Sequence, residues 1–107
     1  MKSTDLGAFE EIVLLCIGIL NDDAYGVTIK EEIEKQTKHR PSVGALHSAL
    51  YRLEKKGFVV SSESGATPQR GGRRKRFYLI TALGKSKLVR AHELRQGMIK
   101  LIPGLEF

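Results

Sequence analysis

The sequence predicts a mainly α-helical domain that carries one small β-hairpin and ends in a long helix. Apolar residues recur at three- and four-residue intervals through most of the chain, and two short runs in its second half are rich in aromatic and β-branched residues. Residues suited to helix ends separate these segments. A length of 107 residues, 41% of them hydrophobic and 28% charged, is that of one globular domain. A lone cysteine excludes an internal disulfide framework and a multi-cysteine zinc site.

The first predicted helix covers Asp5 to about Leu20 and is apolar on nearly all of its sides. Thr4 or Asp5 can cap it by accepting hydrogen bonds from the free amides of its first turn. Such a helix must be covered on more than one side, which a domain of this size has difficulty doing alone. We therefore expect a partner subunit to cover part of it, with Leu14 among the residues of that interface.

The same segment holds the longest apolar run of the chain, Ile12 to Leu20. That run is about half the length of a membrane span, and it follows Glu10 and Glu11 rather than a basic stretch. No small-residue cleavage site comes after it, which argues against a secretory signal peptide. We expect a cytoplasmic protein with no membrane contact, where a single reduced cysteine is ordinary.

Two further helices are expected before the strands. Asn21-Asp22-Asp23 forms a turn whose side chains can cap a helix over Ala24 to Lys38. A third helix is expected from the cap Ser42 to about Lys56, where Gly57 ends it.

The third helix has two unlike faces. Leucines lie on one side, whereas small, polar and basic side chains lie on the other. Small residues let a helix backbone approach a DNA groove closely, and serine or arginine side chains can contact base edges or phosphates. The alternative is that this face only meets solvent. The residues expected to contact DNA here are Ser42, Gly44, Ala45, Ser48 and Arg52.

Most of the net charge lies in one short run. The formal net charge is +6, and the run RGGRRKR over residues 70–76 holds five positive charges and no negative one, which leaves +1 for the rest of the chain. This run meets the second of two strands, expected over Phe58 to Glu63 and Arg74 to Ile80. A charge run is often only a solvated loop, but cations at the tip of a hairpin also suit a phosphate backbone. The expected phosphate contacts are Arg73, Arg74 and Arg76.

A fourth helix is expected from Thr81, its cap, to about Ile102, before Pro103-Gly104. Its apolar residues recur at close to heptad spacing. The stripe can fold back on the core or meet its copy from another chain, and the excess apolar surface of the first helix favours the second. We therefore predict a DNA-binding domain over residues 5–81 and a dimerisation helix over residues 82–105. The expected interface residues of this helix are Leu88, Ala91, Leu94, Met98 and Leu101.

Three helices, a hairpin with a basic tip and a long helix follow one another in the order of a winged helix-turn-helix, in which the third helix enters the major groove. Over about Leu6 to Leu88, the chain also resembles the PadR-type transcriptional regulators. The resemblance rests on an ordered set of fragments, namely Tyr25-Gly26, Gly44-Ala45-Leu46, LYRLEKKG over 50–57, GRRKRFYLIT over 72–81, and Gly84.

This resemblance implies a homodimeric transcription factor, usually a repressor, whose C-terminal helix meets the first and last helices of its partner. It also implies control by a small effector, often hydrophobic or phenolic. Two departures are notable. His47-Ser48 stands where the family usually carries Tyr-Pro, so the groove contacts of that turn are expected to differ. The chain has no Trp, so it lacks the aromatic that some short members use to stack planar drugs.

Other classes of function fit the sequence less well. An enzyme would need a nucleophile with a base, paired carboxylates or clustered metal ligands. Cys16 lies in an apolar helix and the three histidines lie on separate elements, so we expect no enzyme, cofactor or metal. RNA binding is a weaker option because Phe77 and Tyr78 belong to a narrow hairpin rather than a broad stacking sheet. A winged helix that docks an acidic protein is the main alternative, and a shallow salt dependence of binding would indicate it.

Overall fold

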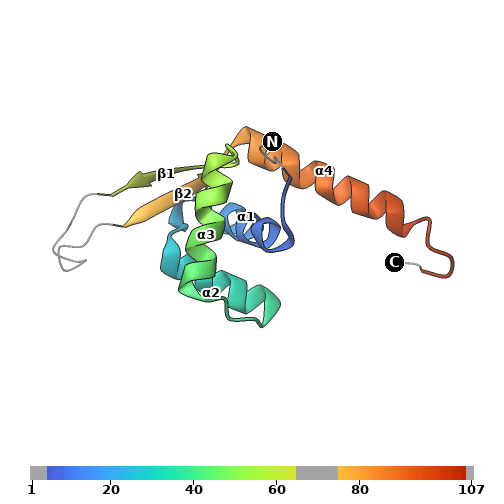
Figure 1. Ribbon diagram of the computed structural model, residues 1–107, viewed down its shortest axis with the longest axis horizontal. Coiled ribbons are helices and arrows are strands. Elements are labelled where there is room, and N and C mark those ends of the chain that lie inside the picture. The colour runs from blue at the N-terminus through green and yellow to red at the C-terminus, as the bar shows by residue number, and fades with distance from the viewer. Residues whose placement is uncertain (1–4, 65–74, 106–107) are drawn as a thin grey trace.

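The computed structural model describes residues 5–64 and 75–105. Its shape is elongated, with extents of 58 × 33 × 22 Å. In Figure 1 the hairpin extends from one side of a body of three helices, and α4 extends from the other. The predicted mainly helical fold with one antiparallel hairpin is confirmed. The elements are α1 (Ala8–Leu20), the short 3₁₀ turn η1 (Asn21–Asp23), α2 (Gly26–Thr37), α3 (Val43–Lys55), β1 (Val59–Glu63), β2 (Arg76–Ile80) and α4 (Ala82–Ile99).

Two of the predicted helix caps are confirmed. The Ser42 hydroxyl accepts a hydrogen bond from the backbone N–H of Ala45 at 3.0 Å, and the Thr81 hydroxyl accepts one from Gly84, also at 3.0 Å. The prediction that Gly57 ends α3 is also confirmed. Gly57 has a φ of +83°, a backbone conformation that residues with a side chain rarely adopt.

The starts of α1 and α2 differ from the predictions. Helix α1 begins only at Ala8, and the carboxylate of Glu10 turns back to accept from the N–H of Gly7 at 3.0 Å, so Asp5 lies outside the helix. Helix α2 begins at Gly26 rather than Ala24. The reason is that Ala24 and Tyr25 are extended and bond to the hairpin, with the N–H of Tyr78 donating to the Ala24 carbonyl at 2.8 Å.

One apolar core lies between the three helices and the root of the hairpin. It is built from the inner faces of α1, α2 and α3 together with Phe58, Val59 and Tyr78. Leu14 is completely buried in this core, so the expectation that it lies at a subunit interface is not supported. Leu15 and Ile19 are the exposed large apolar residues of α1.

The root of α4 is fixed tightly to this body. Gly84 is buried, and a Cβ atom at this position would lie 2.3 Å from the backbone oxygen of Phe58. The N–H of Thr81 donates to the same oxygen at 3.0 Å. Further along, α4 lies beside the start of α1 as far as Arg95, which pairs with Glu11, and its end extends past the body (Figure 1). Within the described residues, no helix combines the length and the apolar character that crossing a membrane requires.

Candidate nucleic-acid interface

The outer face of α3 is the first part of the candidate site. Its leucines, with Ala49, are buried against the body, which turns the opposite side of the helix outward. All five residues expected to contact DNA lie on this outward side and are exposed: Ser42, Gly44, Ala45, Ser48 and Arg52. Because three of them are small at the start of the helix, its backbone is open to close approach there.

The same face carries two residues that the sequence did not single out as contacts. The Tyr51 ring is exposed, and the Nζ of Lys55 lies 5.4 Å from its centre and 3.3 Å from its hydroxyl oxygen. The signal in the sequence was their spacing, because residues three and seven positions after Ser48 lie on the same side of a helix. Together they form an exposed aromatic and cationic pair one turn along from Ser48.

Arg52 is anchored to α1 rather than free in solvent. Its Nε donates to the carboxylate of Glu10 at 2.5 Å, and Lys56 Nζ donates to the other oxygen of the same carboxylate at 2.8 Å. Lys56 also donates to the backbone oxygen of Asp5 at 2.6 Å. One carboxylate thus joins the start of α1 to the second half of α3.

The environment of Glu10 keeps this carboxylate ionised. Burial of Glu10 acts to raise its pKa, but hydrogen bonds from Lys56, Gly7 and Arg52 outweigh the burial and lower the pKa from 4.5 to about 2. Sequence reasoning missed Glu10 as a functional residue. The signal was its register, because Glu10 falls on the same helical face as the buried residues Val13 and Ile17.

The hairpin is the second part of the candidate site. Its strands pair in register from Val59 opposite Ile80 to Glu63 opposite Arg76. Arg73 and Arg74 lie outside the described residues. The side chain of Arg76 is half-exposed, and it donates to the Ser61 hydroxyl at 2.7 Å and lies 3.7 Å from the Glu63 carboxylate. Its charge is therefore partly balanced within the hairpin itself.

Two sets of contacts hold the hairpin in place. Ser61, which accepts from Arg76, donates to the Glu54 carboxylate on α3 at 2.6 Å. On the other side, Tyr25 meets Phe77 edge-on at 5.2 Å, and the Nζ of Lys75 lies 4.1 Å above the Tyr25 ring. The hairpin is thus connected to the end of α3 and to the start of α2, which joins the two parts of the site.

The predicted interface residues of α4 differ in exposure. Leu88 and Ala91 are half-buried, whereas Leu94 and Met98 are 65% and 60% exposed. Leu101 lies just past Ile99, where α4 ends, and is 81% exposed. Near the root of α4, a groove of about 420 Å³ is lined by apolar residues of α1, β2 and α4, including Leu15, Ile19, Leu79 and Leu88.

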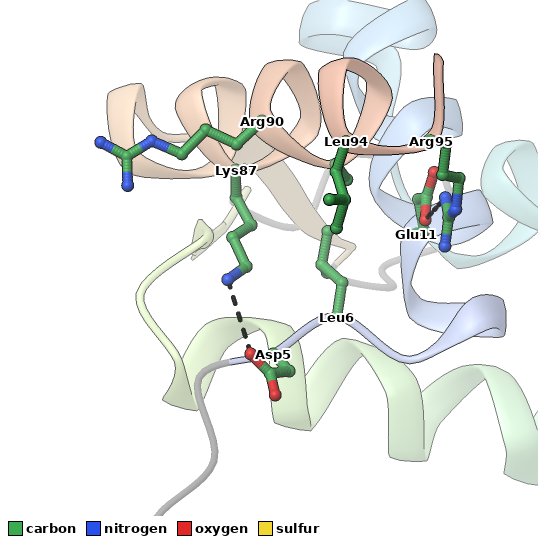
Figure 2. A pocket seen from close by; sticks show the side chains of 8 residues that line it. Asp5, Leu6, Glu11, Lys87, Arg90, Leu94 and Arg95 are labelled. Atoms are coloured by element: carbon green, nitrogen blue, oxygen red, sulfur yellow. Dashed lines mark hydrogen bonds and ion pairs between the residues drawn. The ribbon is translucent and has the colours of Figure 1, made fainter. Parts of the chain in front are cut away.

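A second groove, of about 440 Å³, separates the segment before α1 from α4. Figure 2 shows two ion pairs across it, Asp5 with Lys87 and Glu11 with Arg95, and Leu6 facing Leu94 between them. Charged side chains thus close the groove at two points along α4.

These features define a winged helix-turn-helix protein: a body of three helices, a third helix with a small and polar outer face, and a hairpin fixed beside it. The sequence profile of the transcriptional regulator PadR-like family matches residues 14–90. Because this match covers most of the chain, the protein belongs to that family, which consists of transcriptional regulators rather than enzymes. The predicted resemblance is thereby confirmed.

Solved structures of similar fold cover most of this chain. A transcriptional regulator from Clostridium thermocellum is 28% identical, with a TM-score of 0.70 over 86% of this chain and 84% of its own. The complex structure of hsRosR-SG is 27% identical, with a TM-score of 0.72 over 92% and 80%. A PadR family transcription regulator from Clostridium difficile R20291 shares the fold at 24% identity, with a TM-score of 0.71 over 88% and 94%. A search of curated proteins gave no match.

Proposed function

We propose that this PadR-family protein is a homodimeric, sequence-specific DNA-binding repressor that acts on a two-fold symmetric operator. The observation that carries the proposal is the outward face of α3 beside a hairpin tied to the same helix through Glu54 and Ser61. In this arrangement α3 enters the major groove and the hairpin reaches the adjacent phosphates. Binding at a promoter then excludes polymerase.

The roles of the residues follow from their chemistry. Ser42, Gly44, Ala45 and Ser48 bring the backbone of α3 close to base edges, and Arg52 contacts a base from the same face. Arg73, Arg74 and Arg76 supply affinity for phosphates. Arg76 contributes less than a free arginine because Glu63 and Ser61 already engage it.

Dimerisation is the second element of the proposal. Leu94 and Met98 on the free end of α4, together with Leu101 in the turn just after it, form a row of exposed apolar residues. We assign this row to contacts with the partner's last helix and with the exposed residues Leu15 and Ile19 of its first helix. The division into a DNA-binding part, 5–81, and a dimerisation helix, 82–105, belongs to this proposal. The proposal also includes control by a small hydrophobic effector, and only the resemblance to the family supports that part.

Selection of bound duplexes from a random pool tests the proposal. A two-fold symmetric site is expected, with half-sites roughly 34 Å apart. With about three or four phosphates neutralised per subunit, the logarithm of affinity should fall against the logarithm of salt concentration with a slope of about −5 to −7. No enriched site, together with a shallow slope, would instead favour a module that docks an acidic protein.

Charge removal at the hairpin tests its role separately. The double variant R73A/R74A should weaken binding to operator and random duplexes alike. It should also flatten the salt slope by about one for each phosphate that the hairpin no longer neutralises. The matched control is K100A, which removes a cation from the far end of α4 and should leave the slope unchanged. Full affinity of R73A/R74A would refute the phosphate contacts.

A further inference from the structure

Glu10 supplies a fixed negative charge beneath the DNA-facing helix. Its side chain is 6% exposed, and bonds from Gly7, Lys56 and Arg52 hold the carboxylate from three sides. These bonds hold the Glu10 carboxylate in one position. The side chains that it binds are therefore held in the positions that it dictates.

The two cations bound to Glu10 are used differently. The Lys56 side chain is 12% exposed, and its ammonium is shared between Glu10 and the backbone oxygen of Asp5. The Arg52 side chain is 48% exposed and bonds to Glu10 through Nε alone. Only Arg52 therefore presents donors to the outside.

The edge of Arg52 that remains open is the one suited to base recognition. A guanidinium carries five N–H donors in a rigid plane. With Nε directed at Glu10, the two terminal nitrogens bond to none of the described side chains. Those two nitrogens form the fork that pairs with O6 and N7 of guanine in the major groove.

We propose that Glu10 is a positioning residue for DNA recognition, which holds Arg52 by its Nε so that the terminal nitrogens are directed at a guanine edge. This inference rests on the proposed function of α3. Its physical basis is pre-organisation, because a flexible side chain that is ordered only on binding lowers affinity by about three- to tenfold. Glu10 orders Arg52 before DNA arrives.

The test compares E10Q, R52A and the double variant E10Q/R52A. Each is measured on the selected operator, on operators with single guanine pairs replaced, and on a random duplex. R52A should lose discrimination at one guanine pair in each half-site. E10Q should lower the ratio of operator to random affinity by about three- to tenfold at that same pair. The double variant should lose no more than R52A alone.

Two matched controls separate positioning from general stabilisation. E11Q changes the adjacent carboxylate, which pairs with Arg95 on α4 and not with α3, so the affinity ratio should be unchanged. R95Q removes the other half of that pair and leaves all three bonds to Glu10 in place, so the ratio should again be retained. If E10Q fails to fold by circular dichroism, E10D takes its place. It retains the charge but is shorter by one methylene group, and the same loss at the same base pair is expected.

The outcomes distinguish this inference from the function on which it rests. If R52A loses discrimination while folded E10Q or E10D keeps it, Glu10 does not position Arg52, although the proposed function stands. If the Glu10 variant weakens operator and random DNA equally, its role is structural and the inference is wrong. If R52A itself loses no discrimination, Arg52 does not contact a base. That result would overturn both the role of Arg52 in base recognition and the role of Glu10 in positioning it.

Discussion

Replacing Glu10 by glutamine should remove much of the acid sensitivity of the fold. The pKa of Glu10 is lowered from 4.5 to about 2 in the folded chain, and each unit of such a shift is worth about 1.4 kcal/mol. The ionised carboxylate therefore stabilises the folded state by about 3 kcal/mol. Because the folded pKa lies below the unfolded one, this contribution is complete above about pH 4.5 and is lost as the pH falls toward 2.

Urea unfolding of the wild-type chain and of E10Q between pH 7 and pH 2 measures this contribution. Protein concentration must be held fixed, because association changes the apparent stability. At neutral pH the wild-type chain should be the more stable of the two. The difference in unfolding free energy should then shrink by about 3 kcal/mol between pH 5 and pH 2. Parallel pH profiles of the two proteins would refute the assigned role of the buried ion cluster.

Four further substitutions test the packing and the subunit contact. G84A places a methyl group against the backbone oxygen of Phe58, and should lower the unfolding free energy by about 2–3 kcal/mol. G44A adds a methyl group in open space within a helix, and should raise the same quantity by up to about 1 kcal/mol. Equal effects of these two substitutions in urea unfolding would contradict the close approach at Gly84. L94E and M98E should each yield monomers in size-exclusion chromatography, and dimers that persist would exclude the α4 interface.

The helices of this chain were predictable where local chemistry decides them. Apolar spacing located all four, and the caps Ser42 and Thr81 bond as the sequence predicted. The predictions failed where contacts with residues distant in the sequence determine where a helix begins. Helix α2 begins late because Tyr25 pairs with Phe77, and no local feature of the sequence indicates that pairing.

The candidate site follows the same division. The exposed face of α3 was predictable because one amphipathic helix fixes which residues face outward. The contact between Glu10 and Arg52 was not, because 42 positions separate them in the sequence. Helix α1 shows a different limit. It is apolar nearly all round, so spacing alone could not show that Leu14 faces the core while Leu15 faces solvent.

The apolar row of α4 was compatible with two structures, and the geometry of the chain favours one of them. Gly84 fixes the root of α4 against Phe58, and ion pairs with Asp5 and Glu11 hold the helix beside the start of α1 as far as Arg95, after which it extends past the body (Figure 1). Leu94 faces Leu6 across the groove between α4 and the segment before α1 but stays 65% exposed, and Met98 lies beyond Arg95 and is 60% exposed. Full burial of each such side chain is favourable by about 1.5–3 kcal/mol. Exposed apolar patches are typical of interaction surfaces. A second copy of the chain can bury the whole row symmetrically, which would also set the spacing between two α3 helices on DNA.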